Sequence, residues 1–176
     1  MTKFLSFLKD TLVTLIIAVA IAFLLKYFVI DSCKVLSSSM YPTLQINDRI
    51  LVFKLAYLFG EPQRGDIIVF EPPDELDQGI DYIKRLIGLP GDTIEVKDNA
   101  LYINGEVQTE SYVAELPLYD FGPVTVPEGE YLVLGDNRNL SMDSHEWNYP
   151  FITFDDIEAE AILTYFPFGR FDILQN

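Results

Sequence analysis

The sequence contains almost no cysteine or histidine. Cys33 is the single cysteine and His145 the single histidine among 176 residues. One cysteine excludes an internal disulfide and any metal site built from several cysteines. One histidine excludes a multi-histidine zinc centre. Basic residues are also few, with 12 Lys and Arg against 27 Asp and Glu and a net charge of −15. Because such a surface repels phosphate backbones, we expect no nucleic acid partner.

Only one segment is long and apolar. Leu12–Leu25 carries no charge, and Tyr27–Ile30 extends the apolar stretch past Lys26 to about 19 residues, against roughly 20 for a bilayer core. Lys26 lies near one end, where its stem can carry the ammonium toward the headgroups. The segment predicts one transmembrane helix. A cleaved signal peptide is the alternative, but the apolar part is longer than usual for one and no small-x-small site follows.

Lysines lie on both sides of this segment in nearly equal number, so the positive-inside rule does not orient it. We expect residues 1–31 to form an N-terminal tip and anchor. Residues 32–176 are long enough for one domain with its own core.

The domain is predicted to be mostly β. Short β-branched and aromatic runs are separated by Gly, Pro, Asn and Asp turns, a spacing typical of an antiparallel sandwich or barrel. Asp98-Asn99 and Asn104-Gly105 predict hairpin turns, and Glu110–Gly122 predicts an exposed loop long enough to be mobile. The expected strands are 49–53, 66–70, 81–87, 93–97, 100–103, 130–134 and 159–165.

Ser39 lies about nine residues beyond the apolar segment, in the run Ser37-Ser38-Ser39-Met40-Tyr41-Pro42. A serine on a turn so close to a membrane is a candidate nucleophile for a substrate that emerges from it. Its hydroxyl needs a base. The candidates are His145 and a lysine whose pKa burial has lowered from about 10.4.

Lys84 is the better candidate base. Strand alternation puts Tyr82, Lys84 and Leu86 on one face and Arg85 on the other. If the Tyr82 face is buried, Lys84 is desolvated and neutral enough to accept a proton near about pH 7–8. The alternative is a solvated lysine on an edge strand.

A third polar segment is Gly135-Asp-Asn-Arg-Asn-Leu-Ser-Met-Asp-Ser144, which alone would be an ordinary turn-rich loop. Two motifs precede it in this order, Ser37-x-Ser39-Met-x-Pro-Thr-Leu and Tyr82-Ile-Lys-Arg-Leu-Ile-Gly-Leu-Pro-Gly-Asp. After one apolar span, the three together closely resemble the bacterial type I signal peptidases, the leader peptidases of peptidase family S26. The resemblance covers the anchor and essentially the whole soluble part. The run Leu44-Gln-Ile-Asn-Asp-Arg-Ile is similar to the cyanobacterial and plastid branch.

The resemblance implies a membrane-anchored serine endopeptidase of mostly β fold that removes signal peptides from exported preproteins. Its N-terminus would be cytoplasmic and its catalytic domain on the outer side of a plasma or thylakoid membrane. Ser39 matches the nucleophile, Lys84 the general base, and Ser37 the hydroxyl that joins the Ser39 N–H in the oxyanion hole. A Ser/Lys mechanism needs no cofactor. The partners implied are preproteins with cleavable signal peptides, the lipid bilayer and, further, the export translocon.

Other positions match supporting residues. Ser141 matches the serine that hydrogen-bonds the lysine amine and orients it. Asp136, Arg85 and Asp143 match structural ion-pair positions, and Tyr82 opens the lysine motif. None of these is expected to be catalytic.

His145 stands where the family usually has arginine, so Asp143 is expected to pair with a histidine, a side chain that titrates near about pH 6.5. Glu146–Thr153 also departs from the aromatic-Trp-Gly pattern of the family. We expect both departures to affect local stability more than chemistry.

Several alternatives stay open. His145 could be the base of a Ser-His-Asp triad with Asp143 behind it. A catalytically silent assembly or chaperone subunit would keep the fold and need neither Ser39 nor Lys84. Self-cleaving repressors also use a Ser/Lys pair on a similar fold, but they need a DNA-binding segment where this chain has an apolar span. The apolar and aromatic run Phe53–Phe59 could rest in the bilayer surface or pack as ordinary core.

Overall fold

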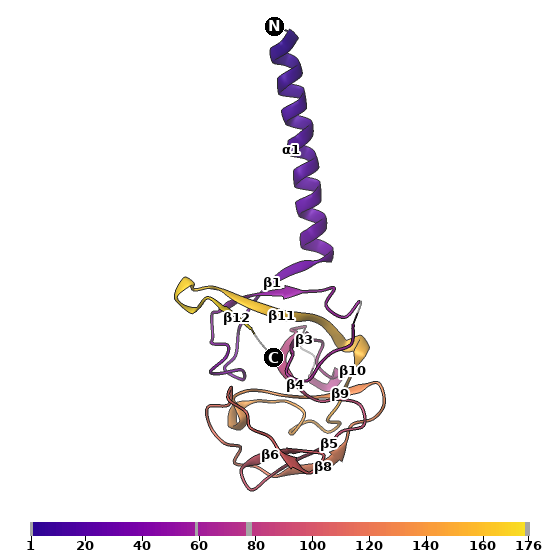
Figure 1. Cartoon of the computed structure of the whole chain (residues 1–176), viewed down its shortest axis with the longest axis vertical. Coiled ribbons are helices and arrows are strands. Elements are labelled where there is room, and N and C mark those ends of the chain that lie inside the picture. The colour runs from indigo at the N-terminus through magenta and orange to yellow at the C-terminus, as the bar shows by residue number, and fades with distance from the viewer. Residues whose placement is uncertain (1, 59, 77–78, 175–176) are drawn as a thin grey trace.

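The computed structural model describes residues 2–58, 60–76 and 79–174. One long helix, α1 (Thr2–Phe28), stands clear of a body built from strands (Figure 1). Phe7–Phe28 has a mean hydropathy of 2.3 and none of it is buried, so by length and composition it can cross a membrane. The helix ends before Ile30, the predicted end of the span, because Ile30 already belongs to the first strand. That strand also contains the predicted domain boundary between residues 31 and 32.

The body is mostly antiparallel β, as predicted. The larger sheet has the order β1-β2-β11-β3-β4-β9-β10, with β12 paired to β11, and the smaller has the order β7-β6-β5-β8. The larger sheet comprises β1 (Ile30–Lys34), β2 (Arg49–Phe53), β3 (Ile67–Phe70), β4 (Tyr82–Gly88), β9 (Glu130–Leu134), β10 (Ile152–Thr153), β11 (Ile157–Phe166) and β12 (Asp172–Ile173). The smaller comprises β5 (Thr93–Lys97), β6 (Ala100–Ile103), β7 (Glu106–Val107) and β8 (Phe121–Thr125). Short 3-10 turns are η1 (Asp74–Leu76), η2 (Arg138–Leu140), η3 (Phe154–Asp156) and η4 (Phe168–Arg170).

All seven predicted strands form, and β11 extends further at both ends than expected. The two predicted hairpin turns also form. Asp98 and Asn99 have φ of 49° and 59°, and Asn104 and Gly105 have 55° and 81°, the left-handed backbone that two-residue hairpin turns require. The predicted loop Glu110–Gly122 is wrong at its end, where Phe121 and Gly122 belong to β8 and Phe121 pairs with Val96 of β5.

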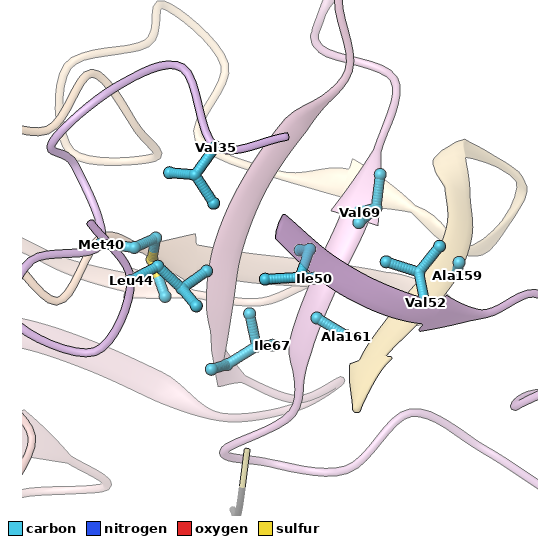
Figure 2. Close-up of a cluster of buried hydrophobic side chains, with 9 residues drawn as sticks. All are labelled: Val35, Met40, Leu44, Ile50, Val52, Ile67, Val69, Ala159 and Ala161. Atoms are coloured by element: carbon cyan, nitrogen blue, oxygen red, sulfur yellow. The ribbon is translucent and has the colours of Figure 1, made fainter. Parts of the chain in front are cut away.

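Three apolar clusters hold the body together. The first, shown in Figure 2, joins Val35, Met40 and Leu44 of the β1–β2 connection to side chains of β2, β3 and β11. The second lies between the sheets, around Ile94, Val96 and Leu132, and the third surrounds Phe70 and Trp147. In β9, alternate residues reach the second and third clusters, so this strand is buried on both faces. Because Met40 and Leu44 belong to the first cluster, that cluster fixes the turn that carries Ser39.

Leu132 tests the second cluster. Its side chain is completely buried, and Leu132→Ala should lower the free energy of unfolding by about 2–5 kcal/mol through lost burial and a residual cavity. The matched control is Leu118→Ala, since Leu118 is 78% exposed and should change stability by less than about 0.5 kcal/mol. Urea unfolding in detergent, followed by the emission of the single tryptophan, Trp147, measures both. Equal effects of the two substitutions would contradict this assignment of the core.

Candidate functional site

Ser39 and Lys84 are 45 residues apart in sequence and in contact in the fold. The Nζ of Lys84 donates a hydrogen bond of 2.7 Å to the Oγ of Ser39. Ser39 is 6% exposed and Lys84 4%. Ser39 lies in the β1–β2 connection, held by the neighbouring buried Met40, while Lys84 lies in β4 opposite Ile68 of β3. The first cluster and the β3–β4 pairing thus bring a hydroxyl and an amine together away from water.

Burial lowers the pKa of Lys84 to about 8, and the negative charges of Asp143 and Asp136 partly oppose this shift. Desolvation disfavours the charged ammonium, whereas a nearby carboxylate favours it. The ring of Tyr82 lies 5.4 Å from the Nζ on the same face of the strand. The predicted burial of Lys84 is confirmed, and the alternative of a solvated lysine is wrong. Near neutral pH the Lys84 amine is therefore uncharged in a fraction of the molecules and can accept a proton there.

Ser37 lies beside the same hydroxyl. Its Oγ is 3.2 Å from the Oγ of Ser39, within hydrogen-bond distance. Ser37 is exposed while Ser39 is buried, so its hydroxyl stands at the solvent side of the pair. The position suits a donor that would face a substrate bound over Ser39.

A buried ion pair lies directly behind Lys84. The Nε and Nη2 of Arg85 each donate to a different carboxylate oxygen of Asp136, both at 2.8 Å. The two side chains are 2% and 0% exposed. Thr43 donates its hydroxyl to the same carboxylate, and Arg85 also donates to the carbonyl of Gly65. Asp136 therefore ties the Ser39 connection to β4.

Gly135 forms the floor of the site. A Cβ added there would lie 2.2 Å from the Oγ of Ser141 and 2.4 Å from the carbonyl oxygen of Ser39, so only glycine fits. The N–H of Asn137 donates to the same Ser39 carbonyl at 3.0 Å. Ser141 is buried, but its Oγ has no hydrogen-bond partner among the described residues. The hydrogen bond expected from Ser141 to the amine of Lys84 is therefore not formed in this structure.

Asp143 and His145 pair as expected. The Nδ1 of His145 lies 2.6 Å from Asp143 Oδ1, and the other oxygen accepts the N–H of Gly135 at 2.7 Å. The imidazole stacks on the ring of Tyr119 with 3.9 Å between centroids. Among the described residues no hydrogen bond joins His145 to Ser39, whose hydroxyl contacts Lys84 and Ser37. The geometry therefore contradicts the Ser-His-Asp alternative.

The sequence motifs did not point to three residues of this region, Glu110, Tyr112 and Arg138. Both Nη atoms of Arg138 donate to Glu110 at 2.6 Å, and the ring of Tyr112 lies 3.9 Å from the Cζ of Arg85. Glu110 and Tyr112 lie in the segment predicted to be an exposed, mobile loop, and the contacts show that part of it packs on the site. The only available signal was Arg138 itself, since a buried arginine requires a carboxylate partner.

A cavity of about 750 Å³ leads to Ser39. It lies between the segment that follows β1 and the beginning of β4, and most of its lining is apolar. In β4 the pairing with β9 begins only at Arg85, and β1 is the edge strand of its sheet. Two backbone edges therefore border the cavity. Its lining includes Cys33, Val35, Leu36, Ile80, Ile83 and Met142.

In the run Phe53–Phe59, Tyr57 is partly buried. Tyr57 packs against the third cluster and its hydroxyl donates to Asp66 at 2.9 Å. These contacts favour the packed alternative for Tyr57, which is partly buried against the third cluster. Leu58 is exposed, and Phe59 lies outside the described residues.

Comparison with known proteins points to one family. The family model for signal peptidases of peptidase family S26 matches residues 8–166. A probable signal peptidase I-2 of Synechocystis is 43% identical over 166 residues, covering 93% of this chain and 75% of that protein. A signal peptidase I of Leptolyngbya laminosa is 41% identical over 168 residues, covering 93% and 82%. The chloroplastic thylakoidal processing peptidase 1 of Arabidopsis thaliana is 36% identical over 158 residues, covering 85% and 46%. The resemblance to the cyanobacterial and plastid branch is confirmed.

Breaking the buried Arg85–Asp136 pair should strongly destabilise the fold. Asp136→Asn leaves the guanidinium of Arg85 buried without a counter-charge, and the free energy of unfolding should fall by about 3–5 kcal/mol. Asp31→Asn is the matched control, because the Asp31–Lys54 pair at 3.0 Å is more than a third exposed on both sides and should contribute at most about 1 kcal/mol. Urea unfolding followed by Trp147 emission compares them. A loss below about 1 kcal/mol for Asp136→Asn would contradict the prediction.

Proposed function

Because the chain belongs to the signal peptidases of peptidase family S26, we propose that it is a membrane-anchored serine endopeptidase in which Ser39 and Lys84 cut signal peptides from preproteins. The observation that carries this proposal is the 2.7 Å hydrogen bond between a buried amine and a serine hydroxyl. A silent assembly subunit would have no need to bury a lysine against a serine, since burial of a charge is costly.

The chemistry follows from these positions. Neutral Lys84 takes the proton of the Ser39 hydroxyl as the oxygen attacks the scissile carbonyl. The oxyanion of the tetrahedral intermediate accepts hydrogen bonds from the Ser39 N–H and the Ser37 hydroxyl, and one such donor can contribute about 3 kcal/mol at the transition state. The intermediate collapses to an acyl-enzyme, and the leaving amine takes the proton from Lys84. Lys84 then deprotonates the water that hydrolyses the ester and returns the proton to Ser39.

The cavity suits an extended peptide. A substrate strand can add to the free edge of β4 before Arg85 and to the edge of β1, so that backbone hydrogen bonds supply affinity without demanding one sequence. Side chains on alternate positions would then face the apolar lining beside Ser39. Such a site fits the small residues, mostly alanine, that the family prefers one and three positions before the cut.

The anchor accounts for the place of the reaction. α1 ends at Phe28 and β1 begins at Ile30, so the cavity-lining residues Cys33 and Val35 follow the helix almost directly. With α1 in a plasma or thylakoid membrane and its N-terminus in the cytoplasm, the site lies close to the outer surface. There the end of a signal peptide leaves the bilayer, delivered by the export translocon.

The direct test is cleavage of a purified preprotein by the detergent-solubilised chain. Wild type should cut after a small-x-small sequence, identified by sequencing the new N-terminus. Ser39→Ala and Lys84→Ala should each lower kcat by at least about a thousandfold, because neither residue of the pair can act alone. Ser38→Ala is the matched control, since Ser38 is the exposed neighbour of Ser39, and it should cut at close to the wild-type rate. Absence of cleavage by folded wild type would refute the proposed function.

The rate should depend on pH through Lys84. Below its pKa of about 8 the amine is protonated and cannot accept the Ser39 proton, so kcat/KM should rise with pH and level off above that value. At a pH two units below this pKa, the neutral fraction of Lys84, and with it the rate, should be about a hundredfold smaller. The control is Lys97→Arg, because Lys97 is an exposed lysine of the smaller sheet and should leave the profile unchanged. A rate that is flat between pH 6 and 8 would rule out Lys84 as the base.

A further inference from the structure

The connection between β7 and β8 reaches from the smaller sheet to the loop that follows β9. Residues Glu110–Tyr119, which we call the strap, contact that loop at several points. We propose that the strap positions the Ser39–Lys84 pair, with Glu110 as its principal positioning residue. The inference rests on the proposed function, because it concerns the same reaction.

The first contact joins Glu110 to the floor of the site. Glu110 is 11% exposed and Arg138 is fully buried, and both Nη atoms of Arg138 bond the carboxylate. The Nε of the same guanidinium donates to the carbonyl of Gly135 at 3.1 Å. Gly135 in turn packs against Ser141 and the carbonyl of Ser39. Glu110 thus fixes Arg138, and Arg138 fixes the residue that contacts the nucleophile turn.

The second contact reaches the residue next to Lys84. The ring of Tyr112 lies over the guanidinium of Arg85, an interaction worth more when desolvated. Burial first, and the Glu110 carboxylate second, raise the pKa of Tyr112. The phenol therefore stays protonated, and its hydroxyl donates to Glu110 at 2.6 Å. Glu110 and Tyr112 act as one unit, since the same carboxylate bonds the tyrosine and Arg138.

The far end of the strap contacts the same loop through exposed hydrogen bonds and one ring stack. The amide of Asn139 donates to the carbonyl of Leu116 at 3.1 Å, and its oxygen accepts the N–H of Leu118 at 2.8 Å. Tyr119 closes the strap by stacking on His145. The loop from Gly135 to His145 is therefore held along its length by the strap, at Arg138, Asn139 and His145.

The consequence for the reaction follows from what the loop touches. It contacts the Ser39 carbonyl through Gly135 and Asn137. It also carries Asp136 and Asp143, the two carboxylates whose charges raise the pKa of Lys84. A released strap would let the loop shift relative to Ser39 and would admit water to the amine. Misplacement of a catalytic group by about 1 Å can cost on the order of a hundredfold in rate. A substitution in the strap should therefore slow the reaction even though the strap itself makes no contact with substrate.

Glu110→Gln in the full-length chain tests the proposal. It should lower kcat by about tenfold or more and move the rising limb of the pH profile to higher pH, because hydration of Lys84 returns its pKa toward the ordinary lysine value. The groups that face that amine, namely the Ser39 hydroxyl, the Tyr82 ring and the Asp136 and Asp143 carboxylates, are all retained in the variant. A merely structural loss of folded enzyme would lower the rate without moving the limb.

Two further variants complete the design. Glu115→Gln removes the same charge from an exposed strap residue and should match wild type. Tyr112→Phe keeps the ring over Arg85 and should be slowed less than Tyr112→Ala. If Glu110→Gln loses the folded emission of Trp147, the two Tyr112 variants carry the test. Wild-type kcat and pH profile in both Glu110→Gln and Tyr112→Ala would overturn the inference alone. Inactivity of wild type and Glu115→Gln would overturn the proposed function and the inference with it.

Discussion

Desolvation of one amine is the constraint on which this site depends. A lysine exposed to water would be protonated near neutral pH and could not accept the proton of Ser39. Burial in β4 lowers the pKa of Lys84 to about 8, and that burial requires packing on every side of the strand. The third cluster supplies Ile68, which lies opposite Lys84 in the β3–β4 pairing, and the β1–β2 connection supplies Met40, which lines the same cavity as Lys84. In the proposed mechanism the apolar cores are therefore part of the chemistry, because their packing lowers the pKa of the base.

Two carboxylates close to the amine would undo this effect if their charges were unopposed. Asp143 and Asp136 both raise the pKa of Lys84. Each has partners of its own: Arg85 bonds both oxygens of Asp136, and the Gly135 N–H and the His145 ring share those of Asp143. A buried pair contributes little to stability when compared with apolar packing. Here these contacts hold the carboxylates of Asp136 and Asp143 in fixed places near the amine. Their positions set how far the pKa of Lys84 is lowered.

Local pattern was sufficient for much of the fold, because strands such as 67–70 and 130–134 are β-branched or apolar runs that pack on both faces. It failed for β1, whose Asp-Ser-Cys-Lys residues are polar and, among the described strands, pair with β2 alone at a sheet edge. The order of the motifs indicated Ser39 and Lys84. It could not indicate Glu110 or Tyr112, since their partners lie far away in sequence and only tertiary packing brings them together. For the same reason the sequence could not show whether Ser141 forms the expected hydrogen bond to Lys84, because this depends on the tertiary packing of the two side chains.

The arrangement of the body would separate two requirements of the proposed membrane-bound protease. β1, which lines the cavity with Cys33 and Lys34, lies at the foot of α1, while β5, β6 and β8 lie at the opposite end (Figure 1). A substrate needs open backbone edges near the bilayer, and open edges are the least rigid part of a sheet. The catalytic pair instead needs rigid support. The smaller sheet can supply it because the β7–β8 connection returns over Arg138 and Arg85. The residues proposed to fix the pair therefore come from the end of the domain farthest from α1 (Figure 1).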